Sequence, residues 1–225
     1  MKPTKPAATR VVILISGRGS NMKALARAAS QMTNVSIEAV ISHSARSEGL
    51  AWARTQGIPT EQVVYDAAGG QTREQYDQTL VSYIDRYQPD IVLLAGFMRI
   101  LSDAFVCHYE GRLINIHPSL LPLFPGMHTH QQALDAGVRV HGCSVHYVIP
   151  ALDQGPIIAQ AVVPVLAEDT AQSLAERVLI MEHRLYPMVL EWLAHGKVFL
   201  DGQGKVEFTQ RLPLQLFYAD TEYVS

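Results

Sequence analysis

Residues 10–16 read RVVILIS, residues 17–21 read GRGSN, and residues 22–30 read MKALARAAS. The first stretch is a continuous apolar, β-branched run that stops at Gly17, which is typical of a strand buried on both faces of a parallel sheet. In the third stretch Met22, Leu25 and Ala29 recur at helical spacing. The order of strand, glycine-rich turn and helix therefore predicts an α/β fold.

The same alternation continues along the chain. Apolar runs predict further strands at residues 35–42, 63–65, 91–96 and 113–117, and helices are expected at about 50–56, 72–89 and 102–109. Strands that alternate with helices in this way pair in parallel through right-handed crossovers. We therefore expect an α/β protein with a mostly parallel twisted sheet flanked by helices, a Rossmann-type fold.

The pattern changes after His117. Residues 118–126 contain three prolines and predict a stiff loop, because each proline fixes its φ angle. Paired strands are expected at 140–149 and 156–165 around a turn with Asp153, and a long helix kinked at Pro187 is expected at 170–195. The predicted boundaries are a flexible leader at 1–10, one domain at 11–195 whose pattern changes at about residue 110, and a hairpin and tail at 196–225 that turns at Asp201-Gly202.

The composition narrows the function classes. The 225 residues include 18 Lys and Arg against 21 Asp and Glu, a net charge of −3, which does not favour nucleic-acid binding by bulk charge. The two cysteines do not favour a disulfide scaffold or a cysteine-rich zinc site. No apolar run approaches the roughly 20 residues needed to span a bilayer, and the N-terminus has no signal-peptide pattern. We expect a soluble cytoplasmic protein without a membrane or nucleic-acid partner.

The turn at Gly17–Asn21 is a candidate anion site. It lies between a buried strand and a helix, where free backbone N–H groups and the helix dipole favour a phosphate. A plain tight turn is the alternative. The dinucleotide fingerprint is incomplete, because Met22 takes the third glycine position and no acidic residue ends the second strand. Ser42, His43, Ser44 and Arg46 occupy that place, which leaves a 2′-phosphate site open.

Asn115 and His117 are candidate catalytic residues. They alternate along one strand, so their side chains point to the same face at its carboxyl end, where ligands of α/β sheets gather. Asp153 is the natural carboxylate partner of His117, although a buried structural histidine and a solvated turn aspartate are the alternatives. The histidines at 117, 128, 130, 141 and 146 do not have metal-ligand spacing, so no metal site is expected.

Four segments together resemble one known family. ISGRGSNMKAL, AGFMRILS, NIHPSLLPLFPGMHTHQQAL and HGCSVHYVIPALDQGPIIAQ are similar, in this order, to phosphoribosylglycinamide formyltransferases, from about Val11 to Trp192. The resemblance implies transfer of a formyl group from 10-formyltetrahydrofolate, as cosubstrate, to the amine of glycinamide ribonucleotide in purine synthesis. It also implies a formyltransferase-like Rossmann-type fold, with a nucleotide-binding half at about 11–110 and a folate-binding and catalytic half at about 111–195. It further implies a cis peptide bond at Leu121-Pro122, small-molecule substrates only, and no metal. Whether the protein is a monomer or a homodimer stays open.

The resemblance also assigns roles to single residues. It implies substrate binding by Gly19, Ser20 and Asn21 at the phosphate and by Glu182 near the ribose. It implies folate binding by Arg73 at the glutamate tail, by Met98, Arg99, Ile100 and Leu101 along the ring, and by Asn115 at the formyl end. Asn115, His117 and Asp153 match the catalytic trio. Arg18 and Cys143 differ from residues of some relatives.

Chemistry agrees with this assignment. Amine attack on a formyl carbon builds negative charge on oxygen, which Asn115 and protonated His117 would stabilise, with His117 as general acid and Asp153 holding it charged and ordering a water. Methionyl-tRNA formyltransferase and formyltetrahydrofolate deformylase use similar residues, but each is expected to carry an additional domain. An NADP oxidoreductase or a noncatalytic nucleotide-binding module would share the first half and leave the trio unexplained.

Overall fold

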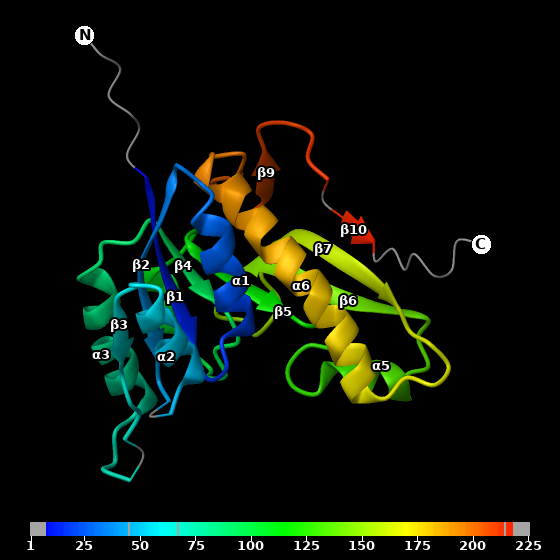
Figure 1. Ribbon diagram of the computed structural model, residues 1–225, viewed down its shortest axis with the longest axis horizontal. Coiled ribbons are helices and arrows are strands. Elements are labelled where there is room, and N and C mark those ends of the chain that lie inside the picture. The colour runs from blue at the N-terminus through cyan, green and yellow to red at the C-terminus, as the bar shows by residue number, and fades with distance from the viewer. Residues whose placement is uncertain (1–7, 45, 67, 214, 218–225) are drawn as a thin grey trace.

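The computed structural model describes residues 8–44, 46–66, 68–213 and 215–217 (Figure 1). The first half contains β1 (Thr9–Ile15), α1 (Ser20–Ala29), β2 (Val35–Ser42), α2 (Glu48–Thr55), β3 (Thr60–Gln62), α3 (Arg73–Asp85), β4 (Ile91–Leu94) and α4 (Asp103–His108). The second half contains β5 (Leu113–His117), α5 (Thr129–Asp135), β6 (Val140–Tyr147), β7 (Ile157–Pro164), α6 (Ala171–Ala194), β8 (Val198–Leu200), β9 (Val206–Phe208) and β10 (Gln215–Phe217).

One sheet runs through both halves of the chain. Its strands lie in the order β10-β7-β6-β5-β4-β1-β2-β3. The pairs of β1 with β2 and β4, of β2 with β3, of β4 with β5 and of β7 with β10 are parallel, and β6 is antiparallel to both neighbours. The predicted mostly parallel sheet is therefore confirmed.

The chain reverses its direction of travel across the sheet beside β1. It moves outward from β1 through β2 to β3 and then returns to place β4 on the other side of β1. Such a switch point opens a crevice at the carboxyl ends of the two strands, where ligands of α/β proteins bind. The loops that follow β1 and β4 therefore lie side by side at this end of the sheet.

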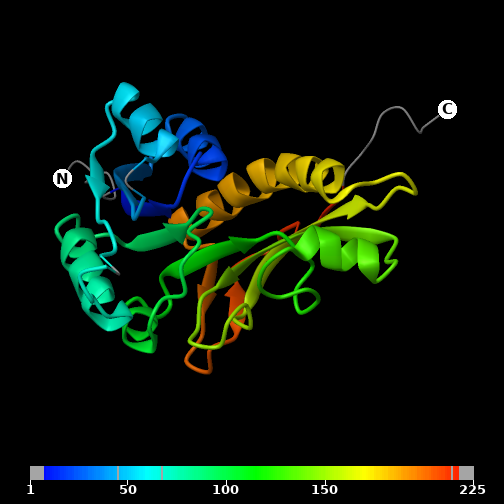
Figure 2. The ribbon, with the colours of Figure 1, turned by 90° about the horizontal axis from the view of Figure 1, so that it is seen from below.

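Two apolar cores cover the two faces of the sheet. Val11, Ile13 and Ile15 of β1 pack with α1, α2 and α6, whereas Val12 and Leu14 pack with α3 and α4. This alternation explains why the strand reads as an unbroken apolar run. In Figure 2 the blue helix α1 and the yellow to orange helix α6 lie on one side of the sheet and the teal helix α3 on the other.

Several elements differ from the sequence prediction. The third strand is Thr60–Gln62 rather than residues 63–65. The chain turns away after Val63, whose carbonyl accepts a hydrogen bond from the Tyr76 hydroxyl, while Tyr65 packs edge-on against the Tyr76 ring. These apolar residues face α3 and do not continue the strand. Helix α5 and strand β10 were not predicted.

The two ends of the chain also differ. Thr9, expected in the leader, begins β1 one residue before the predicted strand, and the Arg10 N–H donates to Asp90 Oδ2. The hairpin of β8 and β9 is confirmed, but its loop spans residues 201–205 because the Asp201 carboxylate accepts N–H groups of Gln203 and Lys205. Residues 1–7 and 218–225, the rest of the leader and the tail, lie outside the described residues.

Candidate active site

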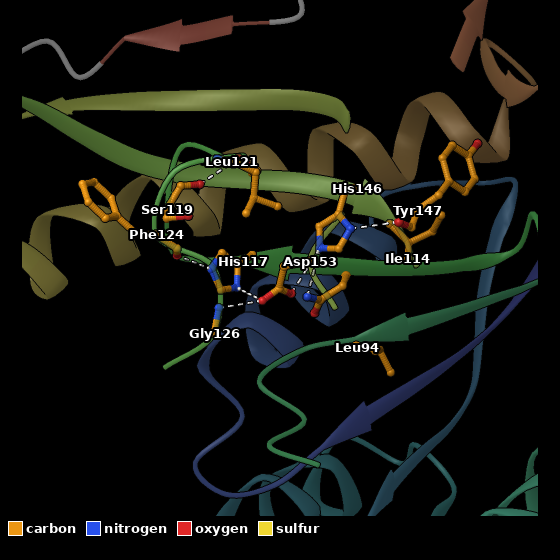
Figure 3. A network of polar contacts seen from close by, with 12 residues as sticks. Leu94, Ile114, His117, Ser119, Leu121, Phe124, Gly126, His146, Tyr147 and Asp153 are labelled. Atoms are coloured by element: carbon orange, nitrogen blue, oxygen red, sulfur yellow. Dashed lines mark hydrogen bonds and ion pairs between the residues drawn. The ribbon is translucent and has the colours of Figure 1, made fainter. Parts of the chain in front are cut away.

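A cavity of about 600 Å³ opens at the carboxyl ends of β4 and β5. Its walls include the three predicted catalytic side chains, Asn115, His117 and Asp153, together with residues 96–101 after β4, residues 126–130, and residues 148–150 and 152. Figure 3 shows His117 and Asp153 pointing toward each other from β5 and from the loop after β6. The fold therefore brings together residues from four separate stretches of the chain.

Strand β5 directs its polar side chains into this cavity. Ile114 and Ile116 belong to the apolar core on the α6 side, so the alternating residues Asn115 and His117 face the other way. His117 is the last residue of the strand and is 5% exposed. The predicted shared face of these two residues is confirmed.

The ring of His117 lies between two oxygen acceptors. Its Nε2 is 3.0 Å from the Phe124 carbonyl oxygen, and its Nδ1 is 3.5 Å from Asp153 Oδ2. The Gly126 N–H donates to the same carboxylate oxygen at 2.8 Å. A neutral imidazole donates to only one of these two acceptors, whereas an imidazolium donates toward both. The 3.5 Å separation between Nδ1 and Oδ2 is longer than an ordinary hydrogen bond of this kind.

Three residues around the cavity have left-handed backbone conformations that are uncommon outside glycine. The φ angles are 53° at Phe124, 58° at His128 and 53° at Asp153. Such conformations cost about 1–3 kcal/mol each and persist where the surrounding structure enforces them. Their position on the two loops that hold His117 indicates that these loops are shaped for the site. The peptide bond at Leu121-Pro122 is cis, as the resemblance implies.

His146 is a site residue that the sequence reasoning missed. Its Nδ1 donates to the Tyr147 carbonyl at 2.8 Å, which leaves Nε2 to accept from the Asn115 Nδ2 amide at 3.2 Å. Burial lowers the pKa of His146, which favours this neutral form. The contact orients the Asn115 amide. Only the register of β5 on β6, which pairs Asn115 with His146, could have revealed the contact.

The phosphate turn predicted after β1 begins helix α1. Gly19 has a φ of 68° and is the N-cap residue of this helix. The Gly17 carbonyl accepts hydrogen bonds from the Gly49 N–H and the Ser47 hydroxyl, both at 3.0 Å. The start of α2 thus holds this turn in place. The backbone N–H groups of the turn lie at the N-terminal end of α1.

The other predicted substrate residue, Glu182, lies directly behind this turn. Asn21 Nδ2 donates to Glu182 Oε2 at 2.7 Å, and both residues are 7% exposed. Burial is the main cause that raises the pKa of Glu182, and the Asn21 hydrogen bond opposes it. The fold therefore joins the predicted phosphate turn to the predicted ribose contact on α6.

The predicted folate residues after β4 divide into two groups. Met98 and Ile100 line the cavity with 68% and 63% of their surfaces exposed, an unusual exposure for apolar side chains. Arg99 also lines the cavity, and its guanidinium lies over the rings of Tyr65 and Tyr76, 3.9 and 4.5 Å from their centroids. Leu101 also lines the cavity. Arg73 does not; it is an exposed residue at the start of α3, 3.4 Å from Glu74.

Two of the remaining histidines pack against each other. His130 and His141 pack ring against ring at 5.3 Å, and burial lowers the pKa of both, that of His141 to about 4. Within the described residues, no group of three or more His, Cys, Asp and Glu side chains has an arrangement that could hold a metal ion. Among the helices of the described part of the chain, none has the length and apolar character to cross a membrane.

Relatives of this chain are numerous. Phosphoribosylglycinamide formyltransferase of Escherichia coli (strain K12) is 48% identical over 211 residues, which covers 93% of this chain and 99% of the relative. The human trifunctional purine biosynthetic protein adenosine-3 is 43% identical over 198 residues, which are 88% of this chain and 19% of that protein.

Solved structures give the same result. Phosphoribosylglycinamide formyltransferase from Anaplasma phagocytophilum is 46% identical to this chain, with a TM-score of 0.85. The match covers 94% of this chain and 100% of the Anaplasma chain. A formyltetrahydrofolate deformylase from Pseudomonas syringae is 28% identical with a TM-score of 0.82, covering 91% of this chain and 67% of that one. Residues 9–190 match the formyl transferase family. The chain therefore belongs to the formyl transferase family and, within it, to the phosphoribosylglycinamide formyltransferases of purine biosynthesis.

Proposed function

We propose that this enzyme transfers the formyl group of 10-formyltetrahydrofolate directly to the amine of phosphoribosylglycinamide, in the cytoplasm, as a monomer or homodimer. The observation that carries the proposal is the meeting of Asn115, His117 and Asp153 in one cavity. Exposed apolar side chains, Met98 and Ile100, lie at this cavity, and the glycine turn that begins α1 follows the nearby strand β1. No covalent enzyme intermediate is needed.

The reaction requires one bond to form and one to break. The substrate amine attacks the formyl carbon, negative charge develops on the formyl oxygen, and the bond to folate N10 then breaks as that nitrogen gains a proton. The Asn115 amide and the His117 ring supply donors for the oxygen, and such donors contribute roughly 10²–10³ in turnover each. The amine loses the proton that N10 gains, and His117 with an Asp153-ordered water carries it.

The two substrates would lie at neighbouring ends of the sheet. The phosphate of phosphoribosylglycinamide would lie on the N–H groups of Gly19, Ser20 and Asn21, with the ribose toward Glu182. The folate ring would lie against Met98, the Arg99 backbone, Ile100 and Leu101, with Asn115 at its formyl end. Arg73 lies outside the cavity wall, where it would contact only the glutamate tail.

Consumption of 10-formyltetrahydrofolate with and without phosphoribosylglycinamide tests this proposal. We expect folate turnover only when the acceptor is present, with one formylated acceptor formed for each tetrahydrofolate released. Formate release at the same rate without the acceptor would indicate a deformylase instead, the activity named for the relative from Pseudomonas syringae.

A further inference from the structure

We propose that Gln160, on β7, is a positioning residue for formyl transfer, because its side-chain amide fixes the loop at residues 118–126 against the sheet. This loop supplies the Phe124 carbonyl that contacts His117 and the Gly126 N–H that contacts Asp153. Gln160 is outside the cavity wall. The inference rests on the function proposed above for His117 and Asp153.

Hydrogen bonds from β6 and β7 hold both backbone groups of Leu121. Gln160 Nε2 donates to the Leu121 carbonyl at 3.0 Å and to Ser144 Oγ at 2.9 Å, one bond for each amide hydrogen. The Leu121 N–H donates to Ser144 Oγ at 3.0 Å, and the Ser144 hydroxyl donates to the Ser119 carbonyl at 2.7 Å. Ser144 is fully buried, so each of these bonds replaces a bond to water. Figure 3 shows Ser119 and Leu121 beside these strands.

The register of the sheet places Gln160 in line with the catalytic histidine. His117 pairs with Ser144 across β5 and β6, and Ser144 pairs with Gln160 across β6 and β7. Directly opposed residues of neighbouring strands lie about 4.5–5.5 Å apart at their Cβ atoms. Three polar side chains therefore lie side by side on neighbouring strands beneath the loop, those of His117, Ser144 and Gln160.

Other contacts also hold the loop, because the Thr129 hydroxyl donates to the Pro118 carbonyl at 2.6 Å and the Phe124 ring packs against His141. Pro118, Pro122 and Pro125 have no backbone N–H to donate. The Ser119 hydroxyl donates to the Leu123 carbonyl at 2.6 Å, and the Leu123 N–H donates to the Leu120 carbonyl at 3.0 Å. These short internal bonds make the loop a compact unit. A shift of its anchor at Leu121 is therefore passed on to Phe124 and Gly126, which hold His117 and Asp153.

The variant Gln160→Met tests this inference, because it keeps the side-chain length and removes both donors. We expect kcat to fall roughly tenfold to a hundredfold, the scale of an ångström-sized misplacement of reacting groups. The KM for phosphoribosylglycinamide should change by less than about twofold, because the phosphate turn is untouched. The variant Gln160→Glu cannot donate to the Leu121 carbonyl when its carboxylate is ionised, so its kcat should also fall. It replaces Gln160→Met as the test if that variant fails to fold.

Asn34→Leu is the matched control. Asn34 Nδ2 also donates to a backbone carbonyl, that of Ala194 at 3.1 Å, in a partly buried position. It precedes β2, at the amino ends of the parallel strands, whereas the cavity lies at the carboxyl ends of β4 and β5. We expect a comparable loss of stability with an unchanged kcat. A kcat of Gln160→Met equal to that of the control would overturn the inference.

A second background separates positioning from general damage. In His117→Ala, the added change Gln160→Met should lower kcat by less than about twofold, since the group it positions is gone. The same fold-loss in both backgrounds would contradict the proposal. The ring ¹⁵N resonances of His117 give a readout that needs no turnover, and they should shift in Gln160→Met but stay in place in Asn34→Leu. If the wild type forms no formylated acceptor, the proposed formyl transfer is wrong. The His117 resonances would still show whether Gln160 positions the His117 ring.

Discussion

Asp153 makes two different contacts with one carboxylate oxygen. Oδ2 accepts the Gly126 N–H at 2.8 Å and lies 3.5 Å from His117 Nδ1, and the side chain is 8% exposed. The residue has a φ of 53°, so its turn directs the side chain back toward the end of β5. A carboxylate in this position would balance the positive charge that the proposed general acid carries.

Replacement of Asp153 by Asn should therefore reduce turnover steeply while the fold is kept. The amide can still accept from the Gly126 N–H, but it carries no charge to balance an imidazolium. We expect kcat to fall by about a hundredfold or more, with Kd values for both substrates within about threefold of the wild type. Rapid-quench rates and equilibrium titrations of the folded variant measure the two effects. A silent substitution would show that Asp153 is a structural turn residue.

Residue positions were predictable where they follow from local geometry. The two-residue repeat of a strand places Asn115 and His117 on one face, which needs no knowledge of the rest of the fold. The contact of Asn115 with His146 depends on the antiparallel register of β5 and β6, which is a tertiary property. For the same reason the stacking of Arg99 on Tyr65 and Tyr76 was not foreseen.

At the scale of elements, the turn between β1 and α1 depends on glycine for a reason within the fold. A Cβ on Gly19 would lie 2.9 Å from Met22 Cε and 3.2 Å from Gly49 Cα, in a backbone conformation that side chains rarely adopt. A Cβ on Gly17 would meet no atom within 4 Å. The sequence predicted the turn correctly but not its packing against α2.

The two glycines should therefore respond differently to substitution. Gly19→Val should lower the free energy of unfolding by about 1–3 kcal/mol, from backbone strain and overpacking, and also weaken phosphoribosylglycinamide binding. Gly17→Ala should fold with a stability within about 0.5 kcal/mol of the wild type. Chemical denaturation and substrate titration of both variants provide the comparison. If Gly19→Val were as stable as the wild type, the close packing of Gly19 against Met22 and Gly49 would not be what requires glycine here.

The junction between β7 and α6 contains a strong ion pair. Arg177 donates to both carboxylate oxygens of Asp169, at 2.7 and 3.0 Å, and these bonds with those from Leu166 and Ser173 lower the pKa of Asp169 to about 2 from an ordinary 3.8. A depressed pKa in the folded state adds stability above the ordinary pKa, and this stability is lost as the pH falls through the folded value.

Asp169→Asn should show this pH dependence directly. We expect the substitution to lower the free energy of unfolding by about 2 kcal/mol at pH 7. The difference from the wild type should shrink between about pH 4 and pH 2, because the carboxylate of the wild type is protonated there. Urea denaturation at both ends of this range provides the test. An equal loss at pH 7 and pH 2 would mean that packing, rather than charge, causes the effect.

At the scale of the whole molecule, one sheet joins the two predicted halves and brings their loops together. The turn after β1 and the loop after β4 lie at the switch point, and the neighbouring strand β5 carries Asn115 and His117. Alternation of strands and helices predicted the mostly parallel sheet but neither the order of its strands nor the switch point. Helix α5 was missed because it is short and directly follows the proline-rich loop. Strand β10 was missed because its pairing with β7, which joins Gln215 to Gln160, is a long-range contact that the local sequence does not indicate.

The central claim is that His117 drives formyl transfer from a site that binds both substrates without it. Single-turnover formylation of phosphoribosylglycinamide by the wild type and by His117→Ala, with Kd values for both substrates measured on the same samples, tests it most directly. We expect a rate about a hundredfold to ten-thousandfold lower in the variant, with both substrates still bound at about wild-type affinity. A rate near that of the wild type in the folded variant would contradict it.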